Sequence, residues 1–553
     1  MRAKKRLYYA DFETTTVSAE GRVRVYLWAI VSGDIVETGD TIDTFLEYIA
    51  KIKNGVIFFH NLKFDFSYIQ YELIKQGIEY SLLEKAGVIY EVTVYDVSIR
   101  DSLNFLPMTL REVGEQYNTL YKKTSIDYNV PWEHVATHEE REYCINDCRV
   151  LEEGLTIYYN TLEQVLNEAG ATESAKKVRK KLTNAGVAYE AFKELSNFKK
   201  VCPKIKHDYY EKFKSAYHGG YVYSRPAGVV EGVQQIDVNS MYPYMYSTIN
   251  MPYGPPILCT TEEDLSRFDF GIIKLSICYE LRPGKLPIIG GSVGRYGSIN
   301  YRSSSQGLYE ELVVSTTDFE LIRDFYDISY SYVWGFGFET KPEMFKQYAD
   351  IFIAIKNASK GVKRNVAKIM LNSPYGKTAM NGLNEIKSYY IDEHDTVTGE
   401  VTGWEIDDDA YQYLPIAIAI TASARNYLLR TADAIGFERV QYMDTDSIKY
   451  IACDVPFKFD DHLLGAWKDE GLVKYFKTIA PKKYIYYDGV MHCKCAGFNR
   501  SIIEQELRDG QEVSEHEALM IMNRFTQGLS LDCLQSKKVS GGRALINVKK
   551  EIK

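Results

Sequence analysis

Apolar runs that end abruptly in acidic residues recur through the first third of the chain. Short runs rich in β-branched and aromatic residues predict strands. Three such runs occur, at residues 7–10, 55–59 and 97–100. Asp11 and Glu13 follow the first run, and strand alternation puts them on one face with Phe12 buried behind. Asp65 follows the second run at a strand-to-helix junction, so strands are expected to deliver several acids to one place.

A helical segment adds two further polar groups to this set. Tyr143 and Asp147 are four residues apart, a spacing that puts them on one helix face. Singly, each acid of the set is more often a cap or turn residue. Together, four acids and a tyrosine are what two-metal phosphodiester hydrolysis requires, because the metals activate a water and stabilise the leaving oxygen. The tyrosine can orient that water, and Lys123 can steady the scissile phosphate.

A second acidic cluster is predicted in the stretch Gln441–Ile448. Asp444 and Asp446 flank Thr445 between two apolar runs, a pattern typical of a turn between buried strands. Burying two like charges close together is unfavourable unless a cation neutralises them. Oxygen ligands favour magnesium or manganese over zinc. The alternative is a solvated Asp-Thr-Asp turn without a metal.

Two more stretches supply parts that match this cluster. A predicted strand leads to Asp237, and the turn that follows enters a helix that carries Tyr242. The alternative interpretation of Tyr242 is an ordinary core residue. Residues 356–377 predict two helices joined by a turn at 357–361. The second helix places basic and polar side chains on one slowly rotating stripe, formed by Arg364, Lys368, Asn372 and Tyr375. Such a stripe suits a clamp on a triphosphate, since phosphoryl transfer needs positioning and charge compensation.

Composition indicates an ordinary soluble protein that is too long for one core. The 553 residues predict two or more domains. The net charge of −9 and the pI near 5.7 argue against a nucleic-acid binder, but basic residues are concentrated in the runs 176–181 and 356–377. Local potential governs binding of a polyanion, although either run could be a solvated helix face. The 45 tyrosines suit surfaces that stack on bases, or amphipathic core edges.

The nine cysteines contain no CxxC pair, which argues against a zinc site or a disulfide framework. Cys144 and Cys148 are one helical turn apart and are expected to be packed thiols. The N-terminal residues 1–6 are not typical of a signal peptide, and no apolar run approaches the length of a membrane span. A soluble protein of a reducing compartment is the expectation.

The exonuclease-like set, in the order Asp11-x-Glu13, Asn61-x-x-x-Asp65 and Tyr143-x-x-x-Asp147, resembles the three 3′–5′ exonuclease motifs of family B DNA polymerases. The protein-primed bacteriophage branch is the most similar. The resemblance implies that Asp11, Glu13, Asp65 and Asp147 bind two metals and that Tyr143 and Lys123 assist catalysis. It also implies a set of residues that contact the single-stranded 3′ end of DNA, namely Thr14, His60, Asn61, Phe64, Ser102 and Leu103.

Polymerising motifs of the same family are matched in order downstream. The matching stretches are Tyr217-His218-Gly219-Gly220, Asp237–Pro243, Lys368–Lys377, Tyr442–Ser447 and Lys482-Lys483-Tyr484. The resemblance implies that Asp237, Asp446 and the carbonyl of Val238 hold two metals, with Asp444 and Lys482 also catalytic. The implied nucleotide-binding residues are Val238, Tyr242, Arg364, Lys368, Asn372 and Tyr375, with Tyr242 excluding a 2′-hydroxyl. The implied DNA contacts are Tyr217, Gly219, Gly220, Arg425 and Tyr484. His218 replaces an arginine of the family and weakens the expected phosphate contact.

The expected architecture is a multi-domain α/β fold with an RNase H-like exonuclease domain and a right-hand polymerase. The predicted segments are an exonuclease domain (1–172), a palm in two parts (173–247 and 412–497), a first terminal-protein-region insertion (248–344), fingers (345–380), a second such insertion (381–411) and a thumb (498–553). Within the second insertion, residues 395–399 suggest a hairpin. The basic segment 173–215 is predicted helical, without assigned chemistry.

The expected function is a DNA-directed DNA polymerase with 3′–5′ proofreading and two magnesium or manganese ions at each site. The resemblance further implies protein priming, processivity and strand displacement during viral genome replication in the cytoplasm of an infected bacterium. Expected partners are primer-template DNA, dNTPs, a terminal protein and a single-stranded-DNA-binding protein, and the chain is expected to be a monomer. Two alternatives remain: a DNA-primed polymerase of the same family, and a DNA-binding replication scaffold whose acids are vestigial.

Overall fold

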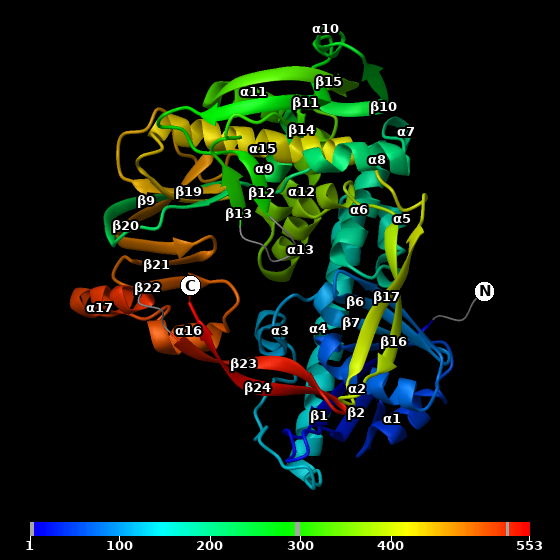
Figure 1. The fold of residues 1–553 in the computed structure, drawn as a ribbon. Coiled ribbons are helices and arrows are strands. Elements are labelled where there is room, and N and C mark those ends of the chain that lie inside the picture. Colours follow the sequence, from blue (N-terminus) through cyan, green and yellow to red (C-terminus); the bar gives the residue numbers. More distant parts are fainter. Residues whose placement is uncertain (1–4, 293–298, 527–529, 553) are drawn as a thin grey trace.

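A seven-stranded mixed sheet formed by the first hundred residues lies in the lower half of the molecule (Figure 1). The structure is a computed structural model that describes residues 5–292, 299–526 and 530–552. Strand order is β3-β2-β1-β4-β7-β6-β5, with β1, β4 and β7 parallel and the outer strands antiparallel. The strands are β1 (Arg6–Thr14), β2 (Val25–Ser32), β3 (Ile35–Gly39), β4 (Gly55–Phe59), β5 (Tyr80–Lys85), β6 (Val88–Val94) and β7 (Val97–Asp101).

Helices cover both faces of this sheet because β1 alternates apolar side chains toward each of them. Tyr8, Ala10 and Phe12 pack with α1 (Ile42–Ile49) and α2 (Leu62–Lys75). Tyr9, on the opposite face, belongs to the core that includes the long helix α4 (His138–Glu168). The 3₁₀ turn η1 (Ser102–Asn104) and α3 (Leu110–Gln116) lead from the sheet toward α4. The three predicted strands and the predicted helix are therefore confirmed.

The basic segment after α4 is helical, as predicted, and joins the two halves of the molecule. Phe192 packs edge-on against Tyr348 and lies 4.5 Å, centroid to centroid, from Phe345. The helical elements here are α5 (Thr172–Ala175), η2 (Val178–Lys180), α6 (Asn184–Leu195), α7 (Phe198–Val201), α8 (His207–Phe213) and η3 (Lys214–Ala216).

A second seven-stranded sheet, in the order β22-β21-β20-β9-β19-β18-β8, lies in the upper half. All of its described pairings are antiparallel. The apolar helix α15 (Leu414–Ile435) and α9 (Met241–Thr248) cover one face and leave the other to the site. Its strands are β8 (Val222–Ser224), β9 (Val230–Val238), β18 (Val440–Asp444), β19 (Ser447–Ile451), β20 (Trp467–Ala480), β21 (Lys483–Tyr487) and β22 (Met491–Cys495).

Residues between α9 and the next helices form an additional antiparallel sheet at the top of Figure 1. Its order is β10-β15-β11-β14, and α11 (Thr316–Phe325) packs between it and α15. The elements are β10 (Met251–Cys259), α10 (Glu262–Leu265), β11 (Phe270–Leu281), β14 (Glu310–Ser315) and β15 (Tyr326–Lys341), with a separate pair β12 (Ile289–Ser292) and β13 (Ile299–Arg302). This sheet fills the segment expected to be the first insertion.

Three helices and a long hairpin follow. The helix pair α12 (Lys346–Ala358) and α13 (Gly361–Asn372) confirms the two helices predicted for residues 356–377. Pro374 starts a separate short helix, α14 (Pro374–Lys377), because proline cannot continue α13. The hairpin of β16 (Leu383–Ile391) and β17 (Val397–Ile406) confirms strands around the predicted turn.

The C-terminal hairpin reaches back across the molecule to the N-terminal sheet (Figure 1). It consists of β23 (Ser530–Val539) and β24 (Gly542–Glu551), and it follows α16 (Arg500–Leu507) and α17 (Glu515–Thr526). At its tip Ser540 donates to Asp395 of the β16–β17 turn, and Tyr71 of α2 donates to the other oxygen of Asp395 at 2.8 Å. The Asp395 carboxylate therefore joins three segments that lie far apart in the sequence.

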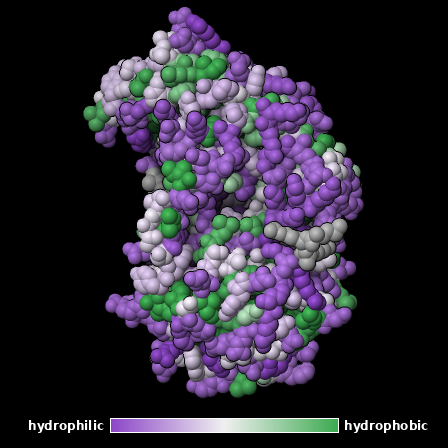
Figure 2. Space-filling model, turned by 90° about the vertical axis from the view of Figure 1, so that its right-hand side faces the viewer, coloured by the Kyte–Doolittle hydropathy of each residue, from purple (hydrophilic) through white to green (hydrophobic). Residues whose placement is uncertain are grey.

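The surface shown in Figure 2 is mostly hydrophilic, with apolar residues scattered among polar ones and a hollow near its middle. Scattered apolar side chains of this kind are normal for a folded protein surface. Among the described residues, no helix has the length and apolarity needed to cross a membrane.

Candidate active sites

The acids of the N-terminal half meet beside the sheet, as the strand pattern predicts. Asp11 and Glu13 lie in β1, Asp65 in the first turn of α2, and Asp147 in α4. Potential ligand atoms of Asp11, Glu13 and Cys144 lie within 4.8 Å of one another. Phe12 points to the other face, where its ring packs edge-on against two phenylalanines.

Burial and mutual repulsion make this cluster receptive to positive charge. Burial and then Asp147 raise the pKa of Asp11 to about 7. Burial and then Asp11 raise the pKa values of Glu13 and Asp65 well above their ordinary range. The Oδ1 atom of Asp147 is buried without a hydrogen-bond partner. An orphaned carboxylate oxygen beside three other acids fits a divalent cation bound by oxygen ligands.

Lys123, Tyr143 and Asp147 form one polar group at the edge of the cluster. The Lys123 ammonium donates to Tyr143 Oη at 2.7 Å and also to Asp147. Burial lowers the pKa of Lys123, but the negative charges of Asp147 and Asp11 together have the larger effect, so the pKa of Lys123 is raised. Tyr128, which had no motif to indicate it, shares a hydrogen bond of 2.8 Å with Tyr143. The structure thus brings Lys123 to the site although its loop carries little sequence signal.

The residues expected to contact a single-stranded end lie around the N-terminus of α2 and the end of β7. His60 is held by Ser102 Oγ at 2.9 Å and by the Met108 carbonyl at 2.8 Å. Burial lowers its pKa, so the ring is neutral near pH 7. Asp101 accepts from the backbone of Asn61 and Leu103, and thereby fixes both segments. The remaining members, Thr14 and Phe64, lie at the end of β1 and in the first turn of α2.

The second acidic cluster forms where β9 and β19 lie side by side. Ser447 pairs with Asp237 across the two strands, and the Val238 amide donates to the Asp446 carbonyl at 2.8 Å. Burial and then Asp446 raise the pKa of Asp237 to about 7. Burial and then Asp444 raise the pKa of Asp446. The predicted convergence of Asp237 and Asp446, from positions far apart in sequence, is present in the fold.

Asp444 forms an ion pair with Lys482. The Lys482 ammonium donates to Asp444 Oδ2 at 2.6 Å, and the Lys482 amide donates to Tyr442 Oη at 3.1 Å. Tyr484 packs on Tyr442 with ring centroids 4.7 Å apart. The turn of the acidic stretch and the Lys-Lys-Tyr stretch are therefore one connected unit, joined by an ion pair and stacked rings.

Side chains of α9, α12, α13 and α14 surround the same acids. Tyr242 and Tyr375 lie with ring centroids 4.3 Å apart. Lys368 is close enough to lower the pKa of Asp446, against the effect of burial. Arg364 donates to the Lys356 carbonyl at 3.0 Å, while Lys356 donates to Ser240 Oγ at 3.4 Å. Of the predicted stripe, Lys368 and Tyr375 lie near Asp446, Arg364 contacts the end of α12, and Asn372 ends α13, so that Tyr375 lies in the separate helix α14.

Gly220 of the Tyr217–Gly220 loop is needed for close approach to the acidic turn, whereas a Cβ atom on Gly219 would have nothing within 4 Å. A Cβ atom on Gly220 would lie 2.4 Å from Thr445 Oγ1, so no other residue fits without displacement. The Thr445 amide donates to the Tyr221 carbonyl at 2.9 Å, and Thr445 has a left-handed φ of 59°. A cavity of about 1060 Å³ opens beside the loop and is lined by Tyr217, Gly219, Gly220, Lys482 and Lys483, among others.

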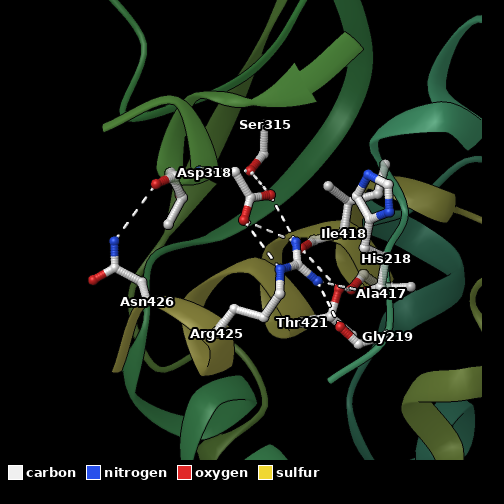
Figure 3. Close-up of polar contacts among 10 residues, drawn as sticks. His218, Gly219, Ser315, Asp318, Ala417, Ile418, Thr421, Arg425 and Asn426 are labelled. Carbon is white, nitrogen blue, oxygen red and sulfur yellow. Dashed lines mark hydrogen bonds and ion pairs between the residues drawn. The ribbon is translucent and has the colours of Figure 1, made fainter. Parts of the chain in front are cut away.

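Arg425 has a different role from the one expected, as Figure 3 shows. Its guanidinium is buried and donates to both carboxylate oxygens of Asp318, at 2.7 to 3.1 Å, and to the carbonyls of His218 and Gly219 at 2.6 and 2.9 Å. Protein acceptors therefore occupy its donors. The expected contact of Arg425 with primer or template is corrected to a positioning role, in which it holds the glycine loop. Burial and Arg425 lower the pKa of His218, which leaves that ring neutral.

Sequence reasoning missed two residues beneath the second cluster. Lys449 is buried in β19, donates to Gln235 of β9, and lies 5.2 Å from the ring centroid of Tyr484. Burial lowers its pKa to about 8, although Asp237 opposes the shift. The sequence does contain one indication of Gln235, because strand alternation puts it on the same face as Asp237. Lys449 had no such signal, since a lysine in a strand is normally exposed.

Comparisons with known proteins show which family the chain belongs to. The sequence model of a family described as "DNA polymerase type B, organellar and viral" matches residues 47–136 and 129–450. The DNA polymerase of Bacillus phage PZA is 30% identical over 521 residues, which cover 87% of each chain. The DNA polymerase of Streptococcus phage Cp-1 is 25% identical over 538 residues, covering 90% of this chain and 92% of that one.

Solved structures show the same likeness over the full length. Phi29 DNA polymerase complexed with primer-template DNA superimposes with a TM-score of 0.84 at 26% identity, covering all of both chains. The ternary complex of the same polymerase with incoming nucleotide substrates gives the same values. The family match spans well over half of this chain. The expected exonuclease and right-hand polymerase architecture is thus confirmed, and the chain belongs to the type B DNA polymerases, organellar and viral.

Proposed function

We propose that the chain is a template-directed DNA polymerase with two separate, metal-dependent centres, one that extends a strand and one that trims its 3′ end. The observation that carries the proposal is that Asp237 of β9 and Asp446, just before β19, are brought together by the pairing of these strands, both with raised pKa values. Lys368 of α13 lies near Asp446. Two divalent cations at each centre are proposed, magnesium or manganese, because the donor atoms are oxygens.

At the extending centre the chain's own residues position the reactants. Asp237, Asp446 and the Val238 carbonyl would hold the cations, which when bound activate the primer 3′-oxygen and stabilise the charge on the phosphates. Lys368 and Arg364 would bind the triphosphate, and Asn372 would contact it at the helix end. Tyr375 would pack against the nascent base pair. Lys482, held by Asp444, would steady the primer end, with Tyr217, Gly219, Gly220 and Tyr484 along the DNA.

At the trimming centre Asp11, Glu13, Asp65 and Asp147 would hold the cations. Tyr143 would orient the attacking water through its hydroxyl, and Lys123 would bind the scissile phosphate. The neutral His60, whose two ring nitrogens are held by Ser102 and the Met108 carbonyl, would contact the strand end through its ring rather than neutralise it. Thr14, Asn61, Phe64, Ser102 and Leu103 would complete the contact with single-stranded DNA.

The extending and trimming activities are expected to be lost independently. In Asp446→Ala, nucleotide addition should fall by on the order of 10³-fold while degradation of single strands persists, and Asp11→Ala should do the reverse. Gel assays of primer extension and of single-strand degradation measure both. Asp454→Ala removes an exposed acid just beyond β19 and should leave both activities unchanged. Loss of both activities from either single change would refute two separate centres.

Tyr242 is expected to exclude the 2′-hydroxyl of a ribonucleotide, because its ring is fixed against Tyr375 beneath the proposed sugar position. Tyr242→Val should reduce discrimination against ribonucleotides by on the order of ten- to a hundred-fold, since steric selection of this kind is worth a few kcal/mol. The ratio of kcat/KM for dNTP and rNTP measures the effect. Tyr242→Phe keeps the ring and should keep the selectivity. Unchanged discrimination in Tyr242→Val would reject the role.

Protein priming, processivity and strand displacement are proposed from the relatives and the insertions. The relatives are bacteriophage polymerases, and the β10–β15 sheet and the β16–β17 hairpin occupy the positions expected for terminal-protein regions. The proposed setting is the cytoplasm of an infected bacterium, with a monomeric enzyme, a terminal protein and a single-stranded-DNA-binding protein. The test is covalent attachment of deoxyadenylate to a candidate priming protein. Extension from DNA primers alone, without such attachment, would favour the DNA-primed alternative.

A further inference from the structure

A thiol lies inside the acidic cluster of the proposed trimming centre. Cys144 is fully buried in α4, one turn after Glu140 and three residues before Asp147. Its Sγ, one carboxylate oxygen of Asp11 and one of Glu13 lie within 4.8 Å of one another. The Sγ atom lies 3.5 Å from the Asp11 carbonyl, to which the thiol donates. The sulfur is therefore directed at β1 and its acids.

A second observation at the same place concerns Asp147. Positions 144 and 147 lie on one helix face, since residues three apart on a helix are neighbours. Asp147 is 1% exposed, and its Oδ1 atom has no hydrogen-bond partner. This buried, unpartnered oxygen is close enough for Asp147 to raise the pKa values of Asp11 and Glu13, so it adds negative charge that favours a cation in the group.

Mixed sulfur and oxygen ligands select different cations from oxygen ligands alone. Carboxylate and carbonyl oxygens suit magnesium and manganese, whereas thiolate ligands favour zinc and cadmium. The ligands expected at the extending centre, Asp237, Asp446 and the Val238 carbonyl, are all oxygens. The two centres of one chain therefore differ in their affinity for a thiophilic cation.

We propose that Asp11, Glu13 and Cys144 form a zinc site within the trimming centre, with water as the fourth ligand, and that zinc bound there switches off trimming while extension continues. The thiol proton passes to solvent as the thiolate binds the cation. Tetrahedral zinc with Zn–S about 2.3 Å and Zn–O about 2.0 Å requires ligand atoms about 3.3–3.5 Å apart, so atoms that now lie up to 4.8 Å apart have to approach by up to about 1.5 Å. The effect on trimming depends on the proposed exonuclease function, but binding of the ion does not.

Cys148 provides a matched control in the same helix. It is also buried, one turn further along α4, and its thiol lies 3.6 Å from the Ala29 carbonyl of β2. Burial raises the pKa of both thiols well above the ordinary value, so neither reacts readily without a cation to displace the proton. Only Cys144 belongs to the group of ligand atoms around Asp11 and Glu13.

The binding test is a cadmium titration of the full-length, metal-free protein, followed by the ultraviolet charge-transfer absorption of a cadmium–thiolate bond. The wild type and Cys148→Ala should develop the band with one equivalent of cadmium, and Cys144→Ser should not. Circular dichroism checks that the Cys144→Ser protein is folded. If it is not folded, the Cys144→Ala protein replaces it in the titration. An equal band in wild type and folded Cys144 variants, or no band in either, would overturn the proposal.

The activity test adds zinc to assays in magnesium. Zinc should abolish single-strand degradation by the wild type and Cys148→Ala at concentrations about ten-fold or more below those needed for Cys144→Ser. Primer extension should be unaffected over the same range. Equal zinc sensitivity of degradation in all three proteins would contradict the proposed switch. Absence of degradation in magnesium alone would instead refute the exonuclease function, and the cadmium band would still decide whether the zinc site exists.

Discussion

Repulsion between buried carboxylates is the constraint on which both candidate sites depend. Asp237 and Asp446 on one sheet, and Asp11, Glu13, Asp65 and Asp147 beside the other, are held where burial and neighbouring acids raise their pKa values. A fold keeps such clusters only if protons or cations neutralise them. Strand pairing supplies the geometry, because β9 and β19 fix two acids with backbone hydrogen bonds rather than flexible side chains.

The surrounding structure restricts movement of these acids. Gly220 touches Thr445, and the Tyr221 carbonyl accepts from the Thr445 amide, so the acidic turn and the glycine loop support each other. Arg425 donates hydrogen bonds to two backbone carbonyls of the same loop and forms an ion pair with Asp318 of α11. A buried ion pair of this kind contributes little net stability, but removing one partner is costly, on the order of 3–5 kcal/mol. The additional sheet is thereby tied to the geometry of the site.

Local patterns predicted much of this from sequence. Alternation in residues 7–13 placed Asp11 and Glu13 on one face, and helical spacing put Tyr143 beside Asp147, because both depend only on near neighbours in the chain. The resemblance to a family supplied what spacing alone could not, including the convergence of Asp237 with Asp446. It also carried Arg425 over as a DNA contact, which its burial against Asp318 corrects.

Other contacts had no local signal. Asp318 and Arg425 are 107 residues apart, and each alone is an ordinary surface residue type. Asp395, in the β16–β17 turn, joins Tyr71 and Ser540, which are 324 and 145 residues away in the sequence. Cys144 was correctly expected to be a packed thiol, but its place among the acids depends on how α4 lies on β1. Such contacts follow from tertiary packing, which composition and periodicity do not encode.

The central claim is that two remote acidic clusters each hold divalent cations. Anomalous scattering from manganese, in crystals of the protein with primer-template DNA and an unreactive nucleotide, tests it most directly. The account predicts manganese peaks between Asp237 and Asp446 and, separately, among Asp11, Glu13, Asp65 and Asp147. Crystals with bound DNA and nucleotide but no peak between Asp237 and Asp446 would contradict it.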